Sequence, residues 1–226
     1  MNITCIHQPD FAPYLGFFHR LLTTDHFIIL DDVQFSRGGW QNRDRIKGRD
    51  RSIWLTLSLE KGNYPKNINE ANLSNDVMWV ENNLNLIRES YSKAKYFSEI
   101  YPKIEIIYYA DHIRMIDFNM AIINLALDYF EINVNMSYAS EWAIATSSSQ
   151  RLVDLVMAVG ADVYLTGQGS KDYLDEQLFS NKGISVLWQE FKHPTYSQLH
   201  GEFEPMLSCL DILFNCGRES ATILRS

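Results

Sequence analysis

The stretch NITCIHQPDFAPYLGFFHRLLTTDHFIILDDV, residues 2–33, decides the fold class. Residues 2–7 predict a short buried strand, and residues 27–33 form an apolar run of strand length that ends in acids. Residues 14–22 are apolar all round, as in a buried helix. A strand, a loop, a helix and a second strand in this order outline a βαβ unit. Because continuous apolar strands are typical of sheets covered on both faces, we expect a parallel sheet.

The rest of the chain extends this pattern. Residues 134–191 predict a second βαβ-like unit, in which Gly160 ends a helix, and residues 52–59 predict a half-buried strand at a sheet edge. Residues 76–130 carry apolar positions at helical spacing. We therefore expect an α/β fold with a mainly parallel sheet, flanking helices and a helical insert. Residues 1–226 would form one domain, with a mostly helical subdomain at about 76–131.

Composition excludes several classes of protein. The formal net charge is -8, from 20 basic and 28 acidic side chains, which disfavours nucleic-acid binding because phosphate contacts dominate such affinity. The three cysteines lack the spacing of a zinc site or a disulfide framework. No run reaches the roughly 18 apolar residues of a membrane span, and the first residues lack the pattern of a signal peptide. We expect a cytoplasmic protein, and an oligomer is compatible with this sequence.

Polar side chains follow the predicted strands, where ligands of parallel sheets collect. His7 is the first candidate for a general acid or base, and Asp32 is the second. Asp31 and Asp32 are adjacent, so their side chains should point to opposite faces. The alternative for His7 is a histidine that ties a turn together by hydrogen bonds.

Two further segments suggest anion binding. Arg43, Arg45 and Lys47 alternate and would share one side of an extended segment, which suits a phosphate or carboxylate; the alternative is a solvated loop. Gly167-Gln-Gly-Ser-Lys171 is typical of a phosphate-binding turn between strand and helix, or it simply makes the turn. No dinucleotide or metal motif is present, so the cofactor stays open between a nucleotide and an activated acyl donor.

Cys216 is a candidate nucleophile with His193 or His200 as its base, or it is a small buried hydrophobic residue. Nothing around these histidines has the spacing of a metal-binding motif such as H-E-x-x-H.

Several long motifs carry a resemblance. HQPDFAPYLGFF at 7–18, FIILDDVQF at 27–35, HPTYSQ at 193–198 and DILFNCG at 211–217 closely resemble the WbqC-like family. The likeness spans almost the whole chain and is weakest in the helical middle. It implies a glycine or acyl transferase acting on an amino sugar in bacterial O-antigen and lipopolysaccharide biosynthesis.

This resemblance completes the functional expectation. We expect an N-acyl or aminoacyl transferase whose amino-sugar substrate is nucleotide-linked. A fainter likeness to pantothenate synthetase favours an ATP-dependent ligase or nucleotidyltransferase, although its H-x-G-H motif is missing here. A non-catalytic nucleotide-sugar-binding protein is the third alternative. The expected substrate-binding residues are Gln8, Asp10, Tyr14, Gln34, Asn42, Arg43, Arg45, Lys47, Thr166, Gly167, Lys171, Tyr173, His193 and Gln198.

Overall fold

The computed structural model describes residues 1–226 and divides them into two compact units. The sheet unit comprises Met1–Gln8, Gly16–Asp32 and Asn133–Lys192, and the helix-rich unit comprises Pro9–Leu15, Val33–Ile132 and His193–Ser226. Each unit is assembled from three separate segments of the chain, and each is described here by itself. That the whole chain acts as a single domain stays a prediction.

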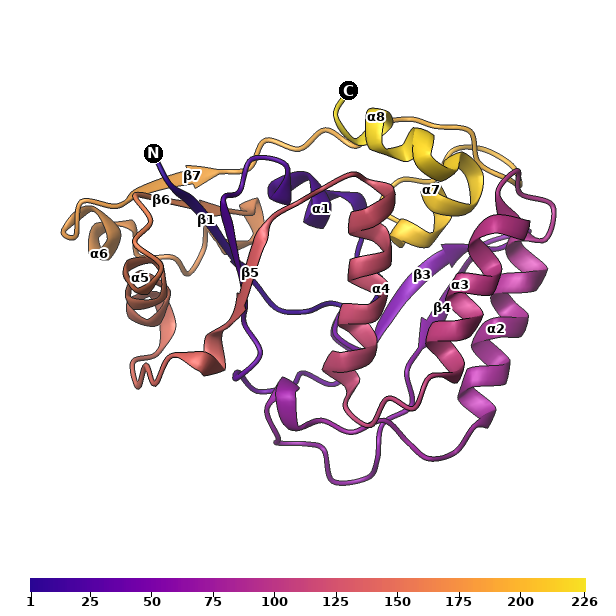
Figure 1. Ribbon diagram of the computed structural model, residues 1–226, viewed down its shortest axis with the longest axis horizontal. Helices are drawn as coiled ribbons and strands as arrows, with labels where there is room; N and C mark the ends of the chain where they lie inside the picture. Colours follow the sequence, from indigo (N-terminus) through magenta and orange to yellow (C-terminus); the bar gives the residue numbers. More distant parts are fainter. The chain divides into compact units, whose positions relative to one another are not determined.

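The sheet unit contains a five-stranded parallel sheet, as expected (Figure 1). The strand order is β5-β2-β1-β6-β7, with the first strand in the centre. The strands are β1 (Ile3–His7), β2 (His26–Ile29), β5 (Asn135–Tyr138), β6 (Val163–Thr166) and β7 (Ser185–Trp188).

Helices cover both faces of this sheet, which explains the continuous apolar strands. On one face, α1 (Leu15–Leu21) places Phe17 edge-on to Phe27 of β2, with ring centroids 5.5 Å apart. On the other face, α5 (Ser148–Ala158) and α6 (Glu176–Ser180) pack against buried strand residues that include Ile6 and Tyr164. Gly160 has a φ of 65° directly after α5, as the sequence predicted for a helix end.

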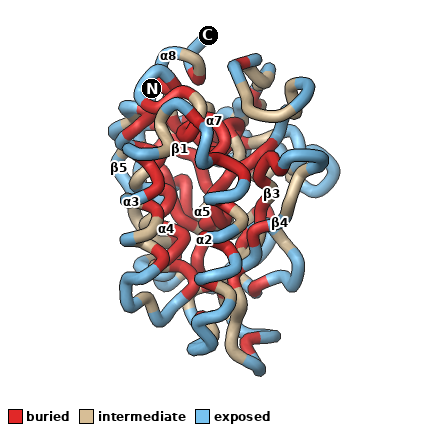
Figure 2. The backbone as a smooth tube through the Cα atoms, turned by 90° about the vertical axis from the view of Figure 1, so that its right-hand side faces the viewer, coloured by how far each residue is buried: buried red, intermediate tan, exposed pale blue.

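The helix-rich unit confirms the helical middle of the chain. It contains α2 (Met78–Tyr91), α3 (Phe97–Tyr109) and α4 (Met115–Tyr129), followed near the C-terminus by α7 (Cys209–Cys216) and α8 (Ser220–Leu224). Buried positions run along α4 and α7, whereas exposed positions follow the connecting loops (Figure 2). Short 3-10 turns are η1 (Ile68–Glu70), η2 (Ala139–Glu141), η3 (Gln168–Ser170) and η4 (Gly217–Glu219).

Two local features add detail to what the sequence predicted. The half-buried strand predicted within residues 52–59 is β4 (Ser52–Thr56), which pairs antiparallel with β3 (Arg43–Lys47) in a two-stranded sheet separate from the parallel one. Residues 43–47 form an extended strand, which is the first of the two expectations for Arg43, Arg45 and Lys47, and both Asp44 and Lys47 are buried in it. The chain end forms α8, in which Ala221 and Leu224 are buried.

None of the helices combines the length and apolar character that crossing a membrane requires.

Candidate functional site

The carboxyl edge of the parallel sheet has a topological switch point between β1 and β6. The chain leaves β1 into α1 on one face, and it leaves β6 toward α6 on the opposite face. At such points the connections diverge and open a crevice in which α/β proteins bind ligands. His7 ends β1, and Gly167 directly follows β6. Both residues named from the sequence therefore flank the switch point.

Strand alternation places these two residues on the same face as α1. Ile6 packs with α5 and α6, so the next side chain, His7, points to the opposite face, where its ring meets Phe17 edge-on at 5.3 Å. In β6, Tyr164 stacks on Phe179 of α6 at 5.1 Å. Gly167 lies three residues after Tyr164, and an odd spacing changes the face of a strand, so its side-chain position faces α1.

The His7 ring is held as a neutral imidazole of one tautomer. Its Nδ1 lies 2.8 Å from the Gln8 carbonyl oxygen, which can only accept, so Nδ1 carries the proton. In the neutral ring, Nε2 then bears the lone pair. Burial, together with the positive charge of Arg20, lowers the pKa of His7 to about 3. His7 is thus uncharged at neutral pH, as a general base must be.

Arg20 is a functional candidate that sequence reasoning missed. It lies on α1, is 6% exposed, and its Nε is buried without a hydrogen-bond partner. A methyl group added at Gly167 would fall 2.5 Å from Arg20 Nη1, so the guanidinium lies against the turn after β6. The one signal in the sequence was an arginine inside a mostly apolar helix.

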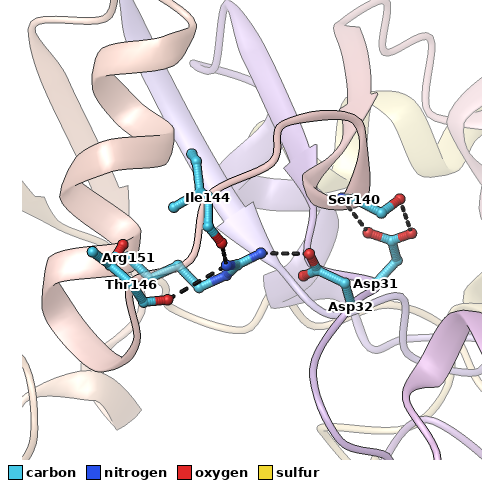
Figure 3. Close-up of polar contacts among 6 residues, drawn as sticks. All are labelled: Asp31, Asp32, Ser140, Ile144, Thr146 and Arg151. Carbon is cyan, nitrogen blue, oxygen red and sulfur yellow. Dashed lines mark hydrogen bonds and ion pairs between the residues drawn. The ribbon is translucent and has the colours of Figure 1, made fainter.

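Asp31 and Asp32 follow β2 and point in different directions, as their adjacency predicted (Figure 3). Asp31 accepts hydrogen bonds from the Ser140 backbone N–H at 3.0 Å and from its hydroxyl at 2.7 Å. Asp32 forms an ion pair with Arg151 of α5, and Arg151 also donates to the Ile144 carbonyl. Both carboxylates therefore anchor the segment before α5, and a role of Asp32 as a base stays a prediction.

The turn after β6 carries a chain of hydroxyl groups. The buried Thr166 donates from Oγ1 to Ser170 Oγ at 3.3 Å, and Ser170 Oγ lies 3.0 Å from the Tyr173 hydroxyl. The Lys171 ammonium lies over the Trp188 ring, 5.5 Å from its centroid. Lys171 and Tyr173 are exposed, so both remain accessible to a ligand at this turn.

The other candidates belong to the helix-rich unit. Lys47 is buried there, and its ammonium donates to the Gln198 side chain at 2.9 Å and to the Glu202 carbonyl. Gln198 in turn donates to the buried Asp211 at 2.8 Å. Lys47 and Gln198 thus meet, as members of an internal polar network. The remaining candidates in this unit are Asp10, Tyr14, Gln34, Asn42, Arg43, Arg45 and His193.

Arg43 and Arg45 share one face of β3, as alternation in an extended segment predicts. Both guanidinium groups lie over Trp54 of β4, at 4.5 Å and 5.8 Å from its ring centroid. Arg45 also forms an ion pair with Glu204 at 3.9 Å. Trp54 is 42% exposed, so this is an accessible cationic and aromatic surface.

Asp44, on the opposite face of β3, is a second group that sequence reasoning missed. It is 4% exposed and accepts a hydrogen bond from the Arg45 backbone N–H at 2.6 Å. Burial raises the pKa of Asp44 to about 8, and the negative charge of Asp10 adds to this effect. The carboxyl group is therefore protonated over much of the neutral range.

The other candidates in this unit make local contacts. His193 donates from Nδ1 to the Pro194 carbonyl at 2.8 Å, and burial lowers its pKa. Two candidates take part in isolated β-bridges, Tyr14 with Ser208 and Gln34 with Asn67. The Asn42 side chain donates a hydrogen bond to the Leu57 carbonyl at 3.4 Å. Asp10 is buried.

Cys216 has the properties of a buried thiol rather than of an activated nucleophile. Burial raises its pKa to about 11, with contributions from Glu219 and Asp211. A thiol with a raised pKa forms little of the reactive thiolate at neutral pH. No group of three or more His, Cys, Asp or Glu side chains is arranged to hold a metal ion.

A parallel sheet with its first strand in the centre and polar groups at the switch point defines a doubly wound α/β protein. The model of the WbqC-like protein family matches residues 8–223, so the chain belongs to this family. Uncharacterized protein Rv1507c of Mycobacterium tuberculosis is 31% identical over 228 residues, covering 100% of this chain and 98% of the relative. No solved structure gives a significant match.

Proposed function

We propose that this protein is an N-acyl or aminoacyl transferase that modifies the amine of a nucleotide-linked amino sugar in bacterial surface-polysaccharide biosynthesis. The observation that carries the proposal is the neutral His7 imidazole, with Nδ1 bonded to the Gln8 carbonyl, at the switch point of the sheet. Membership in the WbqC-like family supports the substrate class.

Amide formation needs a base at this position. The sugar amine attacks the acyl carbon of the donor, so a C–N bond forms and the bond from that carbon to the leaving group breaks. The nitrogen must lose one proton, for which His7 Nε2 is the proposed acceptor, and the proton passes to the leaving group. The side chains and backbone amides of the turn at Thr166–Gly167, together with Lys171, would stabilise the negative charge that develops on the oxygen of the acyl group.

The test is direct conversion of a substrate pair. The full-length protein is incubated with nucleotide-linked amino sugars and glycyl or acetyl donors, and the expected gain in product mass is followed by mass spectrometry. His7→Ala should lower turnover about 100- to 10,000-fold. His26 is the matched control, because it begins β2 at the amino edge of the same sheet and bonds Ser137. Equal turnover by wild type and His7→Ala would remove His7 from the mechanism.

A second candidate is an ATP-dependent ligase, favoured by the strand order, since doubly wound sheets commonly bind nucleotides at the switch point. Pyrophosphate release that requires ATP together with the acceptor would identify it. Tight binding of a nucleotide sugar without any product would instead indicate a non-catalytic binding protein.

A further inference from the structure

We propose that the Arg20 guanidinium binds an anionic oxygen group of the substrate, a phosphoryl or carboxylate group, at the switch point beside Gly167. This assignment deepens the proposed function, because it names the residue that would hold the charged part of the substrate at the same site.

The first observation is a buried cation without a counter-ion. Arg20 is 6% exposed, forms no ion pair, and makes no side-chain hydrogen bond; its Nε is fully buried. Arg151 of the same unit shows the ordinary arrangement, since its partly buried guanidinium is paired with Asp32. Burying an uncompensated charge is costly, and native proteins normally compensate it with an opposite charge. A substrate anion would supply that compensation.

The second observation is the electrostatic setting of this cation. Burial raises the pKa of Cys5 and Tyr164, and the Arg20 charge opposes that rise; burial lowers the pKa of His7 and His19, and the Arg20 charge adds to that lowering. None of these four groups carries negative charge at pH 7. The effect of Arg20 is therefore an uncompensated positive potential around the end of β1. Such a potential in a low-dielectric setting attracts anions strongly.

The third observation is the space that Gly167 leaves. Gly167 has φ -84° and ψ 157°, an extended conformation that any residue adopts, so the backbone does not require glycine here. A side chain would, however, meet Arg20 Nη1 at 2.5 Å and Gln189 Oε1 at 3.9 Å. Glycine is thus needed to let the guanidinium reach the end of β6.

Gln189 holds the helix that carries Arg20. From the segment after β7, its Nε2 donates to the Gly16 carbonyl at 2.8 Å and lies 3.1 Å from His19 Nδ1. Gln189 is itself buried, and its backbone N–H bonds the Thr166 carbonyl at 2.8 Å. The position of α1 against the switch point is therefore fixed by hydrogen bonds, and the cation is preorganised.

The chemistry of the group selects the ligand. A guanidinium offers donors in a planar fork that matches two oxygens of a phosphoryl or carboxylate group. An anion bound there would also offset the Arg20 charge at His7, and so raise the pKa of His7 toward its ordinary value. Substrate binding and the strength of the base would in this way be coupled.

The experiment measures anion binding without turnover. Inorganic pyrophosphate and acetate are titrated separately into the full-length protein by calorimetry, and the tighter of the two identifies the preferred group. Arg20→Met should weaken that binding by about 10- to 100-fold, the effect of losing charge-assisted hydrogen bonds. Arg218→Met is the control, because Arg218 is an exposed arginine of the other unit, paired with Asp128.

Two further measurements separate binding from a structural role. Gly167→Ala keeps the charge of Arg20 but displaces the guanidinium, so it should also weaken anion binding. This second variant keeps the proposal testable if Arg20→Met does not fold. In the wild type, the preferred anion should raise the pKa of His7, followed by its NMR titration. Unchanged affinity in both variants, or no oxyanion binding by the wild type, would overturn the proposal. Acyl transfer can fail while Arg20-dependent binding persists, so the two proposals are distinguishable.

Discussion

Replacing Asp44 by Asn should remove a pH dependence of stability that this buried carboxyl imposes. In the folded protein the pKa of Asp44 is raised to about 8 by burial, whereas in the unfolded chain it is about 3.9. Between these values the folded state holds a proton that the unfolded state has released. The free energy of unfolding contributed by this group is therefore largest at low pH and falls as the pH rises toward 8.

The magnitude follows from linkage. Each pH unit between the two pKa values lowers the free energy of unfolding by about 1.4 kcal/mol, so the loss between pH 5 and pH 8 is about 4 kcal/mol. Asn has nearly the same shape and can still accept the hydrogen bond that the Arg45 N–H donates to Asp44 at 2.6 Å. It has no proton to release, so Asp44→Asn should exceed the wild type in stability at pH 8 by roughly that 4 kcal/mol.

The assay is urea unfolding of both proteins at pH 5, 6, 7 and 8, followed by tryptophan fluorescence. The difference between the two proteins isolates Asp44, because every other group titrates in both. Asp117→Asn serves as the control, since Asp117 is an exposed partner of Arg114 and should change stability by less than about 1 kcal/mol. A constant difference between wild type and Asp44→Asn across this pH range would refute the argument.

Three further predictions follow from other contacts. Asp211→Leu should lower the free energy of unfolding by about 3–5 kcal/mol, because the two tyrosine hydroxyls and the Gln198 amide that bond Asp211 at 2.8 Å would lose their acceptor. Urea unfolding measures this loss, and Asp211→Asn should lower the free energy of unfolding by less. Arg151→Met should destabilise by about 1–3 kcal/mol, because it leaves Asp32 without its ion-pair partner. A double-mutant cycle with Asp32→Asn should show coupling, and strict additivity would contradict the pairing. Cys216 should react slowly with a disulfide reagent at pH 7 and faster toward pH 11; rapid labelling of the native protein at pH 7 would contradict this.

Much of the candidate site was visible in the sequence. A buried strand that ends in His7, and a second that runs into Gly167, predict two polar strand ends at one edge of a parallel sheet. Adjacent Asp31 and Asp32 had to point apart, because alternation is a property of the backbone. These are local rules, and the structure follows them.

The nonlocal features could not be read in the same way. Arg20 sits in an apolar helix and is far from Gly167 in the sequence, so only the packing of α1 brings them together. Lys47 was expected to face an anion, but contacts with Gln198 and Glu202 bury it. Asp44 lies between two arginines, which is typical of a solvated loop, yet the fold buries it.

The sequence by itself determined the α/β class, the parallel sheet and the helical middle. The reason is that the spacing of apolar residues along the chain shows which faces of each helix and strand must be covered. Only the tertiary structure decided that the sheet order places β1 between β2 and β6, and that Gly167 makes room for a buried Arg20. It also decided which of the predicted cations are already bonded within the protein. The physical reason is that a charge reveals its role only through its neighbours, and these come from segments distant along the chain.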